Sequence, residues 1–281
     1  MYAVAWMSGT LFSFCLMAIG ARELSGELSV FQILLCRSVI GLLCICISIV
    51  ISISTQKINL RTDRLGLNIF RNIFHFAGQY GWFLGIGALP LAEVFALEFT
   101  VPIWTLIIAA IFLKEKITLT KIVSVLLGMA GVLIIVQPGY AIVDPISFIV
   151  LGAAVCYAIS HTATKSLSAS ESAISILFYM CLIQLPIGLL LSIGNWSWPV
   201  GLQWLWLIII GMTALSAHFC MAKAMQYAEV TKVITLDFLR LPLIALVGIS
   251  LYAETFEISL VLGGALMFIA NLVVLRRRRV S

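Results

Sequence analysis

Three charged residues interrupt otherwise apolar stretches of the sequence. Glu98 lies in "LEFTVPIWTLIIAAIFLKEKI", and Asp237 and Arg240 lie in "LDFLRLPLIALVGISLYAE". A charge at the centre of a membrane-spanning helix costs about 2.5 to 3.5 kcal/mol, so a partner or a function should offset it. Asp237 and Arg240 are three residues apart and therefore share one face of a helix. Such groups can bind a polar solute or carry a coupling proton or ion.

Other charges in apolar runs are candidate partners for these residues. Arg37 is expected at a depth similar to that of Glu98, so these two could pair, and Arg71 is a possible partner for Asp237. The alternative to a role in transport is that the charges are static clamps between helices. A neighbouring arginine favours the charged carboxylate and so disfavours proton carrying. Glu98 is the better proton candidate, because Asp237 has Arg240 fixed on its own face.

Aromatic and imidazole side chains form a second group of candidates. Trp82 and His218 occupy equivalent positions of an internal repeat, where they could stack on or hydrogen-bond a planar solute. Ordinary helix packing is the alternative for both. Tyr80 and Tyr157 are further candidates of this kind. Weaker ones are His75, Gln79, Trp104 and His161.

The elements that must position these residues are membrane helices. The 281 residues are 62% hydrophobic and only 10% charged, with a mean hydropathy of +1.15, which indicates a polytopic membrane protein. A helix needs about 20 apolar residues to cross a bilayer, and about ten runs of that kind occur. The predicted spans are 3–20, 30–53, 67–88, 92–113, 119–136, 146–164, 173–194, 203–224, 230–252 and 257–275.

The basic residues predict the orientation of the chain. With the N-terminus inside, the inner loops and the tail carry thirteen Lys and Arg residues, against Arg22 alone outside. The positive-inside rule then predicts that both termini lie in the cytoplasm. The protein is expected to be a multi-pass protein of the inner membrane. The net charge of +5 is a topology signal, and the run Arg276 to Arg279 ends the last helix at the lipid headgroups rather than binding nucleic acid.

Several classes of chemistry lack their motifs. The seven cysteines lie in apolar runs without a CxxC spacing, so no metal site, cofactor or disulfide framework is expected. No GxxxxGK[ST] motif is present for ATP. The three histidines lie on different predicted helices and have neither the HExxH spacing nor a Gly-flanked serine beside them, which disfavours an intramembrane enzyme.

The sequence contains an internal repeat. "WFLGIGALPLAEV" (82–94) aligns with "HFCMAKAMQYAEV" (218–230), and "LEF" (97–99) then aligns with "LDF" (236–238). Each repeat holds five predicted spans, an odd number, so the second begins on the opposite side of the membrane. The fold class is therefore an all-α membrane protein with ten transmembrane helices in two inverted five-helix repeats. Inverted repeats are the architecture of secondary transporters.

The paired stretches resemble the two EamA domains of the drug/metabolite transporter superfamily. This resemblance covers almost the whole chain, as a first repeat at 1–138 and a second at 139–281 with its basic tail. It implies cytoplasmic termini and a central cavity lined by the first, third and fourth helices of each half, with the fifth helix peripheral. Thr235 departs from the family pattern, which has Pro there, so the bend is expected to depend on Pro242 alone.

The resemblance and the inverted repeat together predict a secondary transporter that moves a small organic metabolite by alternating access. Family substrates include amino acids, vitamins, nucleoside-like compounds and drugs, and the resemblance does not choose among them. The partners expected are this solute, the lipid bilayer, a coupling proton or ion, and a second copy in a homodimer. A channel is the alternative, and a scaffold or an intramembrane enzyme is more remote.

Overall fold

The computed structural model describes residues 2–52, 60–89, 91–136, 144–252 and 258–275. Lys57, the junction of the repeats at 137–143 and the basic tail at 276–281 lie outside the described residues. All regular structure in the described part is helical. The first repeat contains α1 (Tyr2–Glu23), α2 (Val30–Ser52), α3 (Leu65–Ala88), α4 (Leu91–Glu98), α5 (Val101–Phe112) and α6 (Leu119–Val136). The second contains α7 (Pro145–Leu167), α8 (Ala173–Ser192), α9 (Gln203–Tyr227), α10 (Val230–Leu236), α11 (Arg240–Tyr252) and α12 (Ile258–Leu275), with 3₁₀ turns η1 (Ile193–Asn195) and η2 (Asp237–Leu239).

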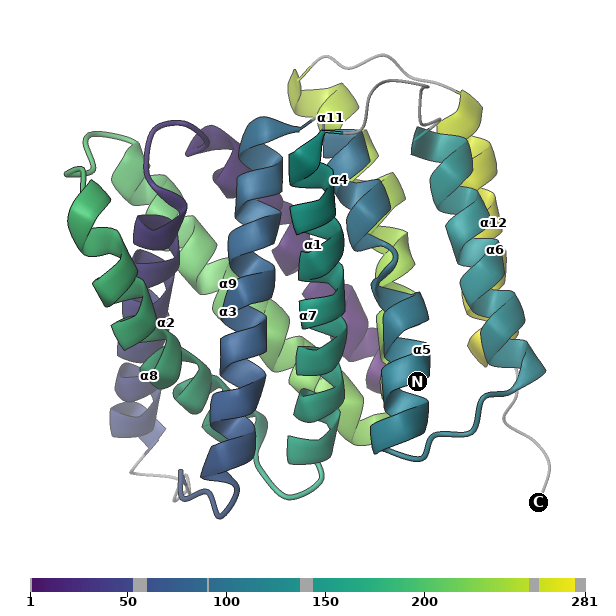
Figure 1. Cartoon of the computed structure of the whole chain (residues 1–281), viewed down its shortest axis with the longest axis horizontal. Coiled ribbons are helices and arrows are strands. Elements are labelled where there is room, and N and C mark those ends of the chain that lie inside the picture. Colours follow the sequence, from purple (N-terminus) through teal and green to yellow (C-terminus); the bar gives the residue numbers. More distant parts are fainter. Residues whose placement is uncertain (1, 53–59, 90, 137–143, 253–257, 276–281) are drawn as a thin grey trace.

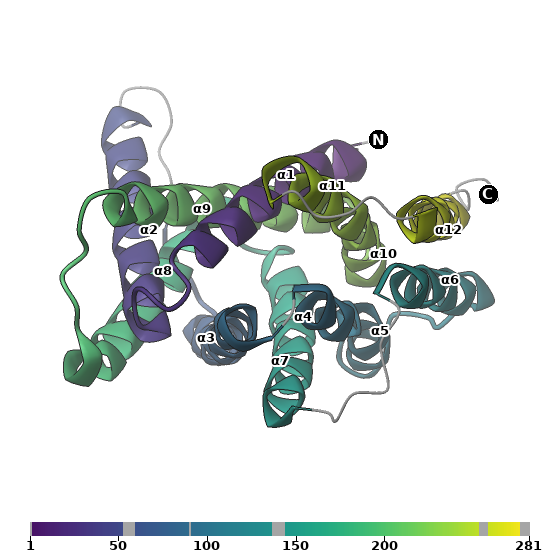
Figure 2. The ribbon, with the colours of Figure 1, turned by 90° about the horizontal axis from the view of Figure 1, so that it is seen from above.

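The helices of the two halves pack in pairs, each with one helix from each half. Helix α1 of the first half packs along α9 of the second, and the equivalent pair is α7 of the second half on α3 of the first. Helices α2 and α8 form a symmetric pair, and α6 packs on α12. From above, α1, α2 and α9 lie on one side of the bundle and α3, α4, α5 and α7 on the other, with α6 and α12 together at one end (Figures 1 and 2). The fifth helices of the repeats are therefore peripheral, as the resemblance implies.

Most predicted spans are long apolar helices. Among the described residues, six helical segments have the length and composition to cross a membrane, and three shorter apolar helices accompany them. Helix α3 is long enough at 24 residues, but its buried face carries Asn68, Arg71, Asn72, His75 and Gln79. This polar face points into the protein rather than to lipid, where polar side chains are costly.

The fourth and ninth predicted spans are broken helices. The first break lies between the end of α4 at Glu98 and the start of α5, and the second is η2, which begins at Asp237. Pro242 follows η2 in the first turn of α11. Pro242 lies four residues after Phe238, so its missing N–H and its ring act on the Phe238 carbonyl inside η2, where the helix is distorted. Broken helices near the membrane midplane are typical of transporter sites.

Local sequence signals set other helix ends and crossings. Asp144 caps α7 by accepting a hydrogen bond from the Ile146 N–H at 2.8 Å, and Pro145 occupies the first turn. Gly188 on α8 lies against the backbone of Leu35, where an added Cβ would meet the Leu35 Cα at 3.2 Å. This glycine allows the symmetric pair α2 and α8 to approach closely.

Contacts between loops gather basic residues at one end of the bundle. Arg64 donates to the Ser166 carbonyl oxygen at 2.7 Å, joining the chain before α3 to the end of α7. Lys165 donates to the carbonyl oxygens of Met225 and Ala228 at the end of α9. At the other end the Ser197 N–H donates to Gln32 Oε1 at 3.1 Å. Chain direction thus alternates as the predicted spans require.

Candidate substrate site

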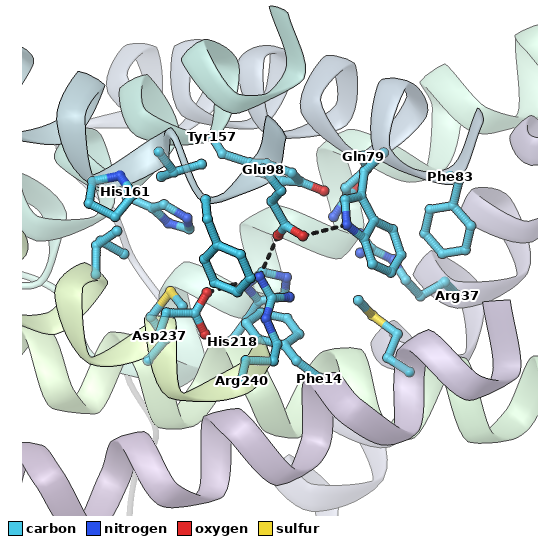
Figure 3. Close-up of a pocket in the computed structure, with 17 residues that line it drawn as sticks. Phe14, Arg37, Gln79, Phe83, Glu98, Tyr157, His161, His218, Asp237 and Arg240 are labelled. Carbon is cyan, nitrogen blue, oxygen red and sulfur yellow. Dashed lines mark hydrogen bonds and ion pairs between the residues drawn. The ribbon is translucent and has the colours of Figure 1, made fainter. Parts of the chain in front are cut away.

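The breaks in the two halves meet at a small cavity inside the bundle. Its charged lining residues are Arg37 and Glu98 from the first half and Asp237 and Arg240 from the second. The cavity volume is about 30 Å³, which has room for about two water molecules. Other polar or aromatic lining residues are Phe14, Gln79, Trp82, Phe83, Phe99, Tyr157, His161 and His218 (Figure 3). This space is smaller than an organic metabolite.

Arg240 joins the two broken helices. Its guanidinium donates to Glu98 Oε1 at 2.5 Å and to Asp237 Oδ2 at 2.9 Å. The Trp82 indole N–H donates to the second Glu98 oxygen at 2.7 Å. Both Glu98 and Arg240 are buried, at 8% and 3% exposure. One acid from each half thus shares a single arginine, and we refer to Glu98, Asp237 and Arg240 as the Arg240 cluster.

Aromatic rings surround the guanidinium of Arg240. Its Cζ lies 5.1 Å from the ring centre of Phe14, 5.5 Å from that of Phe99 and 5.8 Å from that of Phe95. Phe99 and Phe238, equivalent residues of the two repeats, have ring centres 5.6 Å apart. These rings exclude water and add cation–π attraction, which is stronger for desolvated cations.

Arg37 has a different environment. It donates to Gln184 Oε1 on α8 at 2.7 Å, and the Gln184 amide nitrogen lies 2.9 Å from His75 Nδ1. The amide of Gln79 lies 3.0 Å from the same ring nitrogen. The predicted pairing of Arg37 with Glu98 is wrong: a similar depth does not make two helices face each other, and Glu98 faces Arg240. Within the described part of the chain, Arg37 has no carboxylate partner.

Arg71 does not contact Asp237, so this predicted pairing is also wrong. Its Nε donates to Thr164 Oγ1 on α7 at 3.1 Å, and its Nη1 donates to Asn72 Oδ1 at 2.6 Å. Arg71 is absent from the cavity lining and lies toward the basic end of α3. It joins α3 to α7, which matches the clamp alternative.

Four lining residues keep a buried polar atom with no hydrogen-bond partner among the described residues. The unpartnered atoms are Arg37 Nη1, Gln79 Oε1, Asp237 Oδ1 and Arg240 Nε. Leaving such a group buried and unpaired costs about 1 to 3 kcal/mol. Buried polar groups are nearly always hydrogen-bonded in native proteins, so these four atoms indicate a place for water or for a polar solute.

The aromatic candidates separate into those inside and outside the cavity. Trp82, Tyr157 and His218 line it, and His218 lies edge-to-face on His75 with ring centres 4.6 Å apart. Tyr80 does not line the cavity; it stacks on Phe31 with ring centres 4.7 Å apart. Tyr80 directly follows the lining residue Gln79, and a step of about 100° about the axis of α3 turns its side chain toward Phe31 on α2.

Sequence reasoning missed Gln184. It lies in the apolar stretch "YMCLIQLPIGLLLS", yet it is fully buried and connects Arg37 to His75. A lone amide inside a membrane run costs free energy unless it is hydrogen-bonded, so it was a usable signal for an internal polar network.

At the basic end, Glu115 joins the two halves. It accepts hydrogen bonds from the Val230 N–H at 3.0 Å, from the Thr231 hydroxyl at 2.9 Å and from Lys121 Nζ at 3.0 Å. Lys114 adopts the left-handed conformation (φ 54°) after α5 and turns the chain so that Glu115 reaches α10. We refer to these contacts as the Glu115 latch.

Glu229 extends the Glu115 latch toward solvent. It lies 3.5 Å from Lys121 and 3.0 Å from Lys232. Partial burial opposes ionisation of Glu229, but the hydrogen bond from Lys232 and the charge of Lys121 outweigh it and hold its pKa below the ordinary value. At the basic end of the bundle, contacts between charged side chains thus join the two halves.

The described residues contain no cluster of three or more His, Cys, Asp or Glu side chains that could hold a metal ion. The chemistry available at the cavity is therefore ionic pairing, hydrogen bonding and aromatic contact. These interactions suit reversible binding of a polar organic solute.

Comparison with known proteins places the chain in a family. The profile of the EamA-like transporter family matches residues 1–137 and 145–276. The chain belongs to the EamA-like transporter family. It is a multi-pass membrane protein and a transporter of small metabolites, whose cavity lies between its two EamA repeats.

Individual EamA relatives carry different names. A riboflavin transporter of Vibrio cholerae is 32% identical over 68% of this chain and 64% of its own length. A riboflavin transporter of Brucella anthropi is 30% identical over 78% of this chain and 79% of its own length. An S-adenosylmethionine uptake transporter of Rickettsia felis is 25% identical over 78% of this chain and 74% of its own length.

One solved crystal structure has the same fold as this EamA protein. It superposes with a TM-score of 0.82, covering 98% of this chain and 96% of the other, at 16% identity. At that identity the likeness shows the fold alone.

Proposed function

We propose that this EamA protein is a secondary transporter that works by alternating access across the inner membrane, with both termini in the cytoplasm. The observation that carries the proposal is the Arg240 cluster, in which Glu98 of one half and Asp237 of the other share one arginine inside the cavity. Movement of one half against the other must change these contacts, because they cross the boundary between the halves.

The Glu115 latch supplies a gate for this cycle. On the proposed topology it lies at the cytoplasmic end, and it ties the loop after α5 to the start of α10. Breaking the two hydrogen bonds that Glu115 accepts from Val230 and Thr231 would free the halves to separate at that end. The cavity would then open toward the cytoplasm and close toward the other side.

Riboflavin and S-adenosylmethionine are the first candidate solutes, because relatives are named as their transporters. The cavity side chains support a polar organic solute with several hydrogen-bonding groups. Coupling to a proton or another ion belongs to the same proposal. The reason for preferring Glu98 as proton carrier no longer holds, because Arg240 contacts both acids and Asp237 Oδ1 is the oxygen without a partner in the described structure.

Counterflow into proteoliposomes tests the proposal. Liposomes preloaded with unlabelled riboflavin or S-adenosylmethionine should accumulate the labelled solute transiently and saturably. The variant combining Glu98→Gln with Asp237→Asn should lose this counterflow, and Glu23→Gln, at a residue that does not line the cavity, serves as the control. Saturable counterflow unchanged by the double variant would remove both acids from the mechanism.

Two results separate the alternatives. A channel gives flux without saturation or counterflow, and an intramembrane enzyme alters the solute chemically during the assay. A homodimer is a separate prediction, which the mass of the detergent-solubilised protein measures directly.

A further inference from the structure

The charges around the cavity are unevenly distributed. The Arg240 cluster contains one arginine and two carboxylates, so its formal charge is negative. Arg37 lines the same cavity with a positive charge and only amide and imidazole neighbours in the described structure. Figure 3 shows Arg37 and Asp237 on opposite sides of the cavity, with Glu98 and Arg240 between them.

On each of these two sides of the cavity, one polar side-chain atom lacks a hydrogen-bond partner in the described structure. Arg37 Nη1 is a donor with nothing to donate to, and Asp237 Oδ1 is an acceptor with nothing to accept from, within the described residues. Arg37 is 3% exposed, so water outside the protein does not neutralise its charge. An isolated buried cation is costly unless a bound group pairs with it.

We propose that the cavity selects a zwitterionic solute, whose carboxylate binds Arg37 and whose ammonium binds Asp237 and Glu98. This inference rests on the proposed function, since it assigns a substrate class to the proposed transport site. Arginine binds carboxylates through two parallel hydrogen bonds, and Arg37 has one of its terminal nitrogens free. An ammonium can donate to the unpartnered oxygen of Asp237 and also neutralises the surplus acid.

Other classes of solute fit the charges less well. An uncharged planar solute leaves Arg37 without a counter-ion and the Arg240 cluster with its surplus negative charge. A simple anion pairs with Arg37 but is repelled by Glu98 and Asp237. A simple cation pairs with these two acids but is repelled by Arg37. Specificity of this kind arises as much from unpaired charges in the wrong complex as from contacts in the right one.

The test compares matched ligands that differ only in charge. Thermal-shift and calorimetric titrations of the purified full chain use L-methionine, its methyl ester and N-acetyl-L-methionine, and equivalent sets for the other common amino acids. S-adenosylmethionine is compared with decarboxylated S-adenosylmethionine, and riboflavin is the uncharged probe. At least one zwitterion should bind at least about tenfold more tightly than its ester, its N-acetyl form and riboflavin.

Variants assign the preference to Arg37. Arg37→Met should reduce the ratio of zwitterion to methyl-ester affinity to near one, and Arg37→Lys should restore part of it because the positive charge returns. Arg71→Met is the matched control: Arg71 is a buried arginine without an acid partner in the described structure, but it does not line the cavity. That variant should keep the preference.

Three results overturn the inference. They are equal binding of zwitterion and ester by the unaltered chain, binding of riboflavin with no binding of any zwitterion, and a preference that survives in Arg37→Met. The ligand series on the unaltered chain decides the question even if a variant does not fold. In the second of these cases, riboflavin counterflow that depends on Glu98 and Asp237 would leave the transport proposal standing while the zwitterion preference fails.

Discussion

Arg37 and Arg240 line one cavity, yet their surroundings differ. Arg240 contacts two carboxylates and three aromatic rings, whereas the described partners of Arg37 are the amide of Gln184 and, through it, His75. A buried arginine with two acids holds a structure together, because its removal leaves those acids unpaired. Arg37 lines the cavity without an acid partner in the described structure, so its removal leaves no acid unpaired and its charge is available to a ligand. The comparison separates a structural cation from a binding cation.

The largest expected effect comes from Arg240→Met. Removing the arginine leaves Glu98 and Asp237 buried without their cation, and breaking a buried pair costs about 3 to 5 kcal/mol. The variant should show the largest drop in thermal unfolding temperature of the purified protein. Adding Glu98→Gln and Asp237→Asn should restore most of the loss, because no unpaired acid remains. No drop for the single variant would contradict the structural role of Arg240.

A smaller effect on the unfolding temperature is expected from Gly128→Ala, which alters the packing of a residue next to the Arg240 cluster. Phe238, next to Asp237, is fully buried against Gly128, and an added Cβ would lie 2.3 Å from its ring. Overpacking of this kind costs about 1 to 3 kcal/mol. Gly152→Ala is the control, because an added Cβ there meets no atom within 4 Å. Equal unfolding temperatures for the two variants would contradict this packing.

Arg37→Met should be milder still for stability. The substitution leaves Gln184 Oε1 without its donor but also removes a buried charge that has no acid partner among the described residues. We expect a loss of about 1 kcal/mol in the free energy of unfolding, well below that of Arg240→Met. The same unfolding assay checks it. An equal loss in both variants would remove the distinction between the two arginines.

The smallest effect is expected at Glu229, the solvent-facing end of the Glu115 latch. Because its folded-state pKa is lowered, its stabilisation is present above the unfolded-state pKa and is lost as pH falls through the folded-state value. Glu229→Gln should cost less than about 1 kcal/mol at pH 7, since the ion pairs are partly exposed. Its unfolding temperature should meet that of the parent below about pH 4. A difference that grows as pH falls would contradict the assigned shift.

Much of the architecture could be predicted from the sequence. Apolar runs mark the spans, and the repeat at 82–94 and 218–230 indicates the two related halves. The charges at Glu98, Asp237 and Arg240 were found because charge is rare inside membrane helices. The close contact of Asp237 with Arg240 follows from helical spacing alone.

The partners of the cavity residues could not be predicted in the same way. Glu98 and Arg240 are 142 residues apart, and their contact depends on how the halves interleave. The depth of a residue along a helix can be estimated from the sequence, but the rotation of that helix relative to its neighbours cannot. The predicted partners of Arg37 and Arg71 were wrong for this reason. Tyr80 is outside the cavity for the same reason. The helix breaks precede Pro102 and Pro242, so the prolines mark them only approximately.

The most direct test of alternating access cross-links the two sides of the Glu115 latch. It then determines from which side of the membrane a thiol reagent reaches the cavity. In a chain without its seven native cysteines, Glu115→Cys and Thr231→Cys are joined by a short bifunctional reagent that forms a disulfide bond with each thiol. Met17→Cys in the cavity lining is first shown to react with a membrane-impermeant maleimide. With the cross-link in place, Met17→Cys should react only with reagent added from the side opposite the basic end, and counterflow should stop. Reductive cleavage should restore both counterflow and labelling from the basic end. Labelling from the basic end while the cross-link is intact, or undiminished counterflow, would contradict the account.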